Sequence, residues 1–294
     1  MERAAFATDS THLNSLLSSL CHVENLGDND IYRWYMASVR HSTSADQTEP
    51  TDEQAAAPPP DLKLNLIYPC TPKHIKKYSS QAARMVTEPP SLYHNHIRPL
   101  MQRHRADGRL DWVYNIIEGR TEQEDVLHRS AAASTPPAER FLLLPDLNWD
   151  RKTLSSLHLL ALVERRDLWS LRDLAKRHVP WLRAMRRRIV EVVSELEFGM
   201  GRVEADMLKL YVHYQPTYYH FHIHIVHVSL EAGATQAVGK AFGLANIISQ
   251  LETMAGGEDA GMADVELSYT LGEASDLWTE IFLPLKEGRA LDAS

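Results

Sequence analysis

The 294-residue chain is short of cysteine, of basic charge and of long apolar runs. Cys21 and Cys70 are its only cysteines, too few for a disulfide framework or a thiolate zinc cage, and they fit a reducing compartment. The net charge of −8 excludes the basic field that holds long nucleic acids, so any nucleic-acid ligand should be short. No apolar run reaches the roughly 20 residues of a membrane span, and the first residues lack a signal-peptide pattern. We therefore expect a protein of the cytoplasm and nucleus that binds neither membranes nor DNA.

Length and composition predict two globular units of the α+β class. An apolar content of 44% suits two modest cores. Residues 41–60 are polar and rich in proline and alanine, which predicts a disordered insertion. The flanking stretches 30–39 and 61–69 have strand-like composition and should pair in one sheet. The predicted divisions are an N-terminal β-rich lobe at 1–72, a hinge at 73–86 and a C-terminal unit at 87–290.

Periodicity and turn signals give the expected elements of the C-terminal unit. Ser170 and Asp173 have the spacing of a capping box. A new helix should begin at Pro180. Its arginines, at 183 and 186–188, should form a solvated face. Strands are expected at 109–119, 140–149, 208–214, 220–229 and 265–271. The strands 208–214 and 220–229 should form an antiparallel hairpin. Helices are expected at 152–165, at 235–254 and at 274–286, and a further helix should begin at Ser170.

Three histidines share one face of the expected strand 220–229. Alternate side chains of a strand point to the same side, so His220, His222 and His224 form a row, whereas Phe221 and Ile223 face the core. Such a row could ligate zinc with a third ligand from elsewhere, could be structural, or could contain a nucleophile. A neutral imidazole can attack phosphorus and form a covalent phosphoramidate, with neighbouring imidazoles carrying protons. The strand alone leaves these interpretations open.

The stretch HYQPTYYHFHIHIVHV, residues 213–228, resembles the signature of the histidine triad (HIT) hydrolases. The residues before the triad are similar to those of the scavenger mRNA-decapping branch, and other stretches resemble that branch in the same order. They are NDIY at 29–32, LNLIYP at 64–69, KHIKKY at 73–78, WVYNI at 112–116, PDLNW at 145–149 and SLRDL at 170–174. The resemblance covers nearly the whole chain, so the protein is identified as a member of this branch.

The resemblance implies hydrolysis of the 7-methylguanosine cap dinucleotide, or of short capped oligonucleotides left by 3′-to-5′ mRNA decay. The products would be 7-methylguanosine monophosphate and a nucleoside diphosphate, formed through a nucleotidyl-histidine without a metal or other cofactor. The family is a domain-swapped homodimer. Its smaller N-terminal lobes close over C-terminal HIT-like α+β domains with an antiparallel sheet.

The resemblance also implies roles for individual residues. His222 would be the nucleophile, His220 and His224 its triad companions and His213 a further histidine beside the phosphates. The cap-binding residues would be Trp112 and Leu147 on the two faces of the base, Glu122 at the guanine edge, and Asp146 and Asn29; Lys73, Lys77, Thr217 and Tyr218 would contact the phosphates. Without the resemblance, Trp112 would be interpreted as a core residue of an apolar strand, Leu147 as packing and Glu122 as a solvated loop acid.

Two departures from the family pattern affect these expectations. Asn148 stands where the family commonly has a lysine beside a tryptophan, which predicts weaker binding of the polyphosphate. The resemblance begins around residues 4–17, whereas family members usually carry further N-terminal strands, so dimer exchange and lobe closure are in question. The alternatives are a triad hydrolase of other dinucleoside polyphosphates and a cap-binding regulatory paralogue with weak catalysis.

Overall fold

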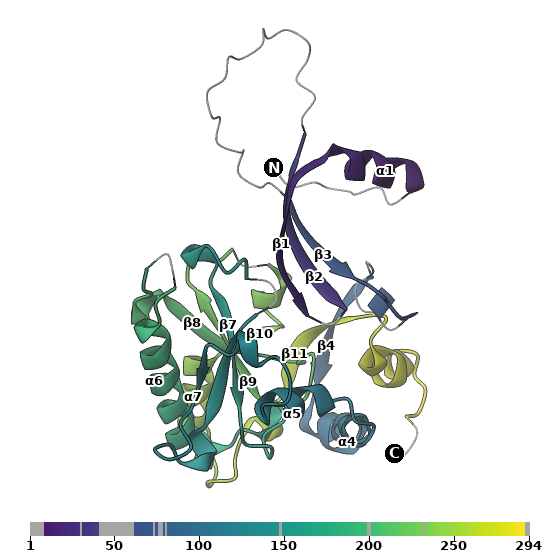
Figure 1. Cartoon of the computed structure of the whole chain (residues 1–294). Coiled ribbons are helices and arrows are strands. Elements are labelled where there is room, and N and C mark those ends of the chain that lie inside the picture. The colour runs from purple at the N-terminus through teal and green to yellow at the C-terminus, as the bar shows by residue number, and fades with distance from the viewer. Residues whose placement is uncertain are drawn as a thin grey trace, which may run out of the picture. The chain divides into compact units, whose positions relative to one another are not determined.

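The computed structural model describes residues 9–29, 31–40, 62–72, 74–75, 79, 81–146, 149–198, 201–231 and 233–291. The chain divides into two compact units, Met1–Tyr78 and Ser79–Ser294 (Figure 1). The predicted insertion at 41–60 lies outside the described residues. Within the described ranges, no helix has the length and apolar character needed to cross a membrane.

Among its described residues, the first unit contains the helix α1 and a three-stranded antiparallel sheet in the order β1-β2-β3. Asp9 caps the helix, because its carboxylate accepts hydrogen bonds from the backbone N–H groups of Thr11 and His12. β2 and β3 pair antiparallel, which confirms the prediction that the stretches around the insertion are strands of one sheet. The elements are α1 Ser10–Ser19, β1 Leu20–Asn29, β2 Tyr32–Val39 and β3 Leu62–Ile67.

The second unit is built on a six-stranded antiparallel sheet in the order β10-β8-β9-β7-β6-β5. Its strands are β5 His128–Arg129, β6 Phe141–Pro145, β7 His158–Val163, β8 Leu208–His213, β9 His222–His227 and β10 Ala241–Gly243. The longer helices are α4 Arg98–Ala106, α5 Asp111–Ile117, α6 Val179–Glu195 and α7 Leu244–Thr253. Short helices occur at α3 Pro90–Leu92 and α8 Leu283–Lys286, each beside a π-helical turn, Tyr93–Ile97 and Trp278–Phe282.

The two faces of this sheet have different partners. Residues such as Leu143, Ala161 and Ile223 point into the main core, which also contains the buried sides of α6 and α7 (Figure 1). Residues of the opposite parity, including Leu142 and Leu162, pack against α5. His222 pairs directly with Leu162, so the histidine row lies on the face that α5 covers.

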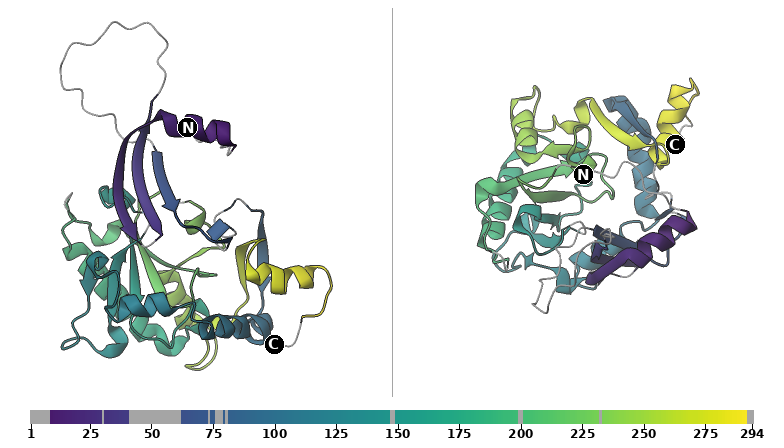
Figure 2. Two further views of the ribbon diagram at one scale, coloured as in Figure 1. Left: turned by 45° about the vertical axis from the view of Figure 1, so that its right-hand side comes forward. Right: turned by 90° about the horizontal axis from the view of Figure 1, so that it is seen from above.

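A separate two-stranded sheet joins segments that are far apart in the chain. β4, Ala83–Glu88, pairs antiparallel with β11, Leu267–Gly272, and Figure 2 shows the blue and yellow strands side by side. β11 confirms the predicted strand near 265–271, and α8 with its π-helical turn confirms the C-terminal helix.

Two predicted elements have the wrong type. The segment 109–119 was expected to be a strand but contains α5, because Leu110, Val113 and Ile117 recur at helical spacing and form one buried face. The segment 152–165 was expected to be a helix but contains β7. Its HLLALV run is nearly continuous in apolar character because β7 is a central strand covered on both faces.

Two further helices differ in extent. The predicted helix 235–254 begins only at Leu244, after the short edge strand β10. The capping box of Ser170 and Asp173 is present, but it caps a single 3₁₀ turn, Leu171–Asp173, before α6 begins at Val179 beside Pro180. In α6, Arg183, Arg186 and Arg187 are exposed, as predicted for a solvated face.

Candidate functional site

The histidine row lies near the middle of the six-stranded sheet. β9 is hydrogen-bonded to β8 on one side and to β7 on the other, which fixes the direction of every side chain along it. Phe221, Ile223 and Ile225 enter the main core, as the alternation predicted. His222 and His224 point to the opposite face and are only 5% and 6% exposed. The candidate site is therefore a pair of buried imidazoles on a strand held from both edges.

Backbone geometry sets the tautomer of His222. Its Nδ1 lies 2.7 Å from the backbone oxygen of His220, two residues earlier in the chain. A carbonyl oxygen can only accept, so Nδ1 carries the proton and donates it to this oxygen. The other ring nitrogen, Nε2, consequently keeps its lone pair, which is the form that a nucleophile requires.

His220 and His213 are held by backbone carbonyls as well. His220 donates from Nε2 to the oxygen of Val163 over 2.7 Å, and its ring meets that of Tyr114 edge to face. His213 donates from Nε2 to the oxygen of Thr235 over 2.8 Å, and its ring centroid lies 4.0 Å from that of His224. His220 thus serves His222 through its carbonyl, while His213 lies beside His224.

Burial keeps these imidazoles neutral. It is the main reason why the pKa values of His213, His220 and His222 are lowered to about 4. Burial and the neighbouring histidines lower the pKa of His224 further. All four rings are uncharged near neutral pH, so the lone pair of His222 is available there.

Aromatic rings connect the nucleophile candidate to the surface. Tyr218 stacks on His222 with centroids 4.2 Å apart and an angle of 18° between the rings. Trp112, on α5, meets Tyr218 edge to face at 4.9 Å. Trp112 is 46% exposed, so it is not the core residue that an apolar strand would have made it. A partly exposed aromatic side chain is therefore accessible to a ligand, in direct contact with the ring that stacks on His222.

Two acids lie close to this aromatic series. Asp146 and Glu122 both raise the pKa of Tyr218, although burial contributes more to that shift. Glu122 adopts a left-handed backbone conformation, with φ of 55°, which is uncommon for a residue other than glycine. Asp146 directly follows β6 and is partly buried. The family resemblance implied that both acids lie in a cap pocket, and both act on Tyr218 here, whereas their contacts with the base stay a prediction.

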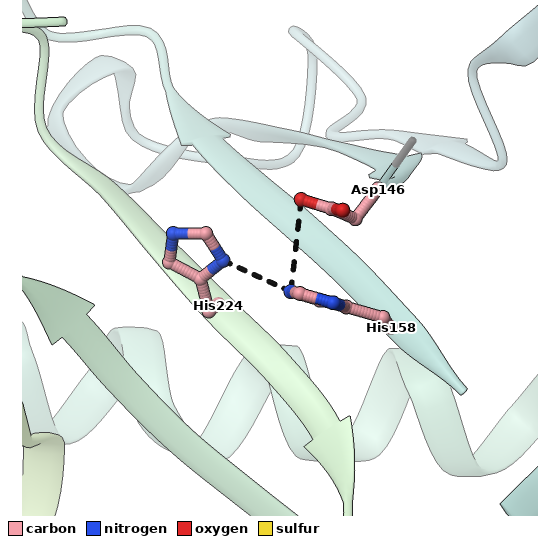
Figure 3. Close-up of side chains that lie close together, drawn as sticks. All are labelled: Asp146, His158 and His224. Atoms are coloured by element: carbon pink, nitrogen blue, oxygen red, sulfur yellow. Dashed lines mark hydrogen bonds and ion pairs between the residues drawn. The ribbon is translucent and has the colours of Figure 1, made fainter. Parts of the chain in front are cut away.

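A third histidine from a different strand completes a cluster with Asp146 and His224 (Figure 3). His158 Nε2 lies 3.1 Å from His224 Nδ1 and 3.6 Å from Asp146 Oδ2. The three ligand atoms lie within 4.8 Å of one another, so this group could also hold a metal ion. It is not the zinc site considered from the sequence, because it combines histidines of neighbouring strands with an acid from a third segment.

Sequence reasoning missed His158 and Lys240. His158 was not recognised because its segment was interpreted as a helix. If the segment had been interpreted as a strand, His158 would have been expected on the same face of the sheet as His222 and His224. Lys240 is half-buried and donates to the backbone oxygen of Gln215 over 2.5 Å. Its charge lowers the pKa values of His213 and His224, so it supplies a positive charge close to the row.

Some predicted site residues cannot be placed. Leu147, Lys73 and Lys77 lie outside the described residues, as does Asn148, and the same holds for the side chain of Asn29. Thr217 is described and exposed, in the loop between β8 and β9. The individual roles of all these residues stay predictions.

Comparisons with known proteins agree on one family. Residues 1–81 match the family model "Scavenger mRNA decapping enzyme (DcpS) N-terminal", and residues 111–239 match "Scavenger mRNA decapping enzyme C-term binding". The chain is 33% identical to an m7GpppX diphosphatase of Schizosaccharomyces pombe, over 93% of this chain and 81% of the relative. It is 32% identical to one of Ascaris suum, over 85% and 74%, and 34% identical to one of Homo sapiens, over 65% and 54%. With the matched ranges spanning both units and the histidine row, the chain belongs to the scavenger mRNA decapping enzyme family.

Proposed function

We propose that this protein is an m7GpppX diphosphatase that hydrolyses the cap dinucleotide, or short capped oligonucleotides, with His222 as nucleophile. The observation that carries the proposal is the series Trp112–Tyr218–His222, which links an exposed tryptophan to a neutral imidazole. A 7-methylguanine is a cation, and cations bind well to an aromatic face. The names of the relatives support the same substrate class.

The chemistry follows from the tautomer of His222. Nε2 attacks the phosphorus that bears 7-methylguanosine, a P–N bond forms, and the bond to the bridging oxygen breaks. A nucleoside diphosphate leaves with the electron pair. The backbone oxygen of His220 accepts from Nδ1 and stabilises the positive charge that develops on the ring. Water then attacks the same phosphorus, breaks the P–N bond and releases 7-methylguanosine monophosphate.

Lys240 is a further source of positive charge close to the histidines. Asn148 replaces a lysine of the family pattern, which predicted weaker binding of the polyphosphate. Lys240 lies close enough to His213 and His224 to lower their pKa values. It would neutralise part of the charge on the phosphate oxygens, together with the proposed contacts of Lys73, Lys77, Thr217 and Tyr218.

Base recognition would use the acids near Tyr218. Glu122 would accept hydrogen bonds from the guanine edge, where a carboxylate pairs well with a cationic base. Asp146 would lie near the bound nucleotide, with Leu147 opposite Trp112 and Asn29 contributed by the N-terminal lobe. A pocket of this kind prefers the methylated cap, whereas a triad hydrolase of other dinucleoside polyphosphates would use GpppG and m7GpppG equally.

The direct test follows release of 7-methylguanosine monophosphate from m7GpppG in excess chelator, with wild type and His222→Asn. We expect steady release by wild type and none by the variant. His227→Asn is the matched control, because His227 lies on the same strand but outside the row, and its Nδ1 accepts from the backbone of Ser229. Cap binding without release by wild type would instead support the regulatory paralogue, and loss of activity in chelator would support a metal-dependent hydrolase.

A further inference from the structure

We propose that His158 is a positioning residue, which holds His224 in the tautomer that donates a hydrogen bond from Nε2 to a substrate phosphate oxygen. Nε2 of His158 makes a hydrogen bond with His224 and also faces the carboxylate of Asp146 at ion-pair distance (Figure 3). Its role in catalysis rests on the proposed function, whereas the tautomer itself can be measured without substrate.

Strand register explains why His158 reaches His224. Leu160 of β7 lies directly opposite His224 of β9, and His158 is two residues earlier on β7, on the same face of the sheet. The two rings are diagonal neighbours, with centroids 5.4 Å apart and nitrogens 3.1 Å apart. Both side chains are buried, so water does not compete for this contact.

The position of the carboxylate decides which nitrogen carries the shared proton. His158 Nε2 faces two groups, Nδ1 of His224 and Oδ2 of Asp146 at 3.6 Å. At 3.6 Å the carboxylate is too far away to accept a hydrogen bond, but its negative charge favours a proton on His158 Nε2 over a lone pair there. His158 therefore donates and His224 Nδ1 accepts. The single proton of neutral His224 must then lie on Nε2.

This tautomer gives a role to an otherwise unsatisfied atom. Within the described part of the chain, His224 Nε2 is buried and has no hydrogen-bond partner. Buried polar groups normally have a hydrogen-bond partner. The Nε2–H group of His224 lies next to the proposed nucleophile, so its missing partner indicates that a ligand atom accepts this hydrogen bond. The ring of His224 lies 5.2 Å from that of His222, close enough for both to address one phosphate group. His224 would thus stabilise charge that develops on a phosphate oxygen.

The same cluster could instead bind a metal ion, as its ligand spacing allows. A metal-bound imidazole usually donates its other N–H to a protein acceptor, and His224 Nε2 has none among the described residues. The observation favours the hydrogen bond between His158 and His224 over a metal site.

The experiment compares His158→Leu, which removes the donor, with His158→Gln, whose side-chain amide can still donate to His224 Nδ1. We expect His158→Leu to lower kcat for m7GpppG roughly 10- to 100-fold with little change in KM, and His158→Gln to recover most of the loss. His128→Leu is the matched control, because His128 lies on β5 of the same sheet, and two strands, β7 and β6, separate β5 from β9. Its kcat should stay within about twofold of wild type, since surface and edge changes rarely alter a distant site.

Long-range ¹⁵N–¹H spectra of the histidine rings give the second readout, with the His224 signals identified in His224→Asn. Wild type should show His224 protonated at Nε2, and His158→Leu should show a mixture of tautomers. Protonation of His224 at Nδ1 in wild type, or equally slow Leu and Gln variants with an unchanged tautomer, would overturn the proposal. A wild-type rate that falls in chelator and returns with Zn²⁺ would overturn it in favour of the metal site.

The two readouts separate the proposals. If wild type fails to hydrolyse the cap but shows the Nε2 tautomer, the proposed function fails while the positioning contact stands. If His158→Leu does not fold, the wild-type tautomer and the rate of His158→Gln still decide the question.

Discussion

At the scale of single residues, the site depends on which atoms keep their protons and which faces stay exposed. His222 has its Nδ1 proton directed to a carbonyl of its own strand, so burial and backbone geometry together produce a neutral nucleophile. Trp112 stays 46% exposed although Val113, Ile116 and Ile117 of the same helix are buried. Predictions for both residues follow from these two facts.

Trp112→Leu should raise KM for m7GpppG roughly 5- to 150-fold, because base–aromatic stacking contributes about 1–3 kcal/mol per base. Trp112→Phe should lose less, since it keeps a smaller ring. Melting temperatures should hardly change, because the side chain is 46% exposed. Steady-state kinetics with m7GpppG and GpppG check this, and equal KM values for the two substrates in wild type would contradict stacking of the methylated base.

The pH dependence of kcat/KM should follow protonation of His222. Burial lowers its pKa to about 4 from an ordinary 6.5, so the ring keeps its lone pair down to about pH 5 and loses it below. The rate should therefore be flat between about pH 8 and 5 and then fall. A decline centred near pH 6.5 would show that His222 is not held neutral by burial.

The same shift has a stability consequence that must be separated from catalysis. A histidine whose pKa is lower in the folded state than in the unfolded state costs stability as pH falls from about 6.5 to about 4. Unfolding should therefore become easier across that window. Circular dichroism at each pH distinguishes loss of fold from protonation of an intact site.

At the scale of elements, a buried ion pair anchors the segment that leads into the histidine strand. Glu88 and Arg172 are fully buried, with the carboxylate and guanidinium 2.7 Å apart. Glu88 also accepts hydrogen bonds from Tyr214 and from Gln215, at 2.6 and 2.9 Å, and from Tyr269. The end of β4 is thereby tied to the loop that contains Tyr218.

Glu88→Gln should lower the free energy of unfolding by about 3–5 kcal/mol, because it leaves the buried guanidinium without a charge partner. Arg183→Ala is the matched control: it removes an exposed pair with Glu252 and should cost about 0–1 kcal/mol. Urea unfolding of both variants measures the difference. Equal losses would mean that the Glu88 network does not stabilise the unit.

At the scale of the whole molecule, we propose the homodimer that the family resemblance implies, with lobes exchanged between subunits. A predicted hinge at 73–86 and the N-terminal family match over residues 1–81 support a lobe that could be exchanged. The proposed preference for short capped RNA follows from closure of that lobe, because a long RNA would obstruct it. Location in the cytoplasm and nucleus stays a prediction.

Sedimentation equilibrium should therefore give twice the 33.4 kDa of the chain at concentrations where the cap is hydrolysed. A chain lacking residues 1–72 should then sediment as a smaller species and lose its preference for short substrates. A full-length monomer with full activity would contradict the exchanged dimer.

The sequence predicted those features that are local or carried by a continuous motif. The alternation of β9, the hairpin with β8, the helix restarted at Pro180 and the family all follow from residues close together in the chain. The secondary-structure types of α5 and β7 could not be predicted in this way. A short apolar run suits both a helix and a central strand, and the neighbouring layers determine which one forms.

The row of imidazoles on one face of a strand follows from local sequence, since a period of two is a property of the extended backbone. The contacts of His158 with His224 and with Asp146, by contrast, depend on the register between β7 and β9 and on where β6 ends. The exposure of Trp112 likewise depends on how α5 packs on the sheet. Register and packing are set by interactions between segments far apart in the chain, which local sequence patterns do not contain.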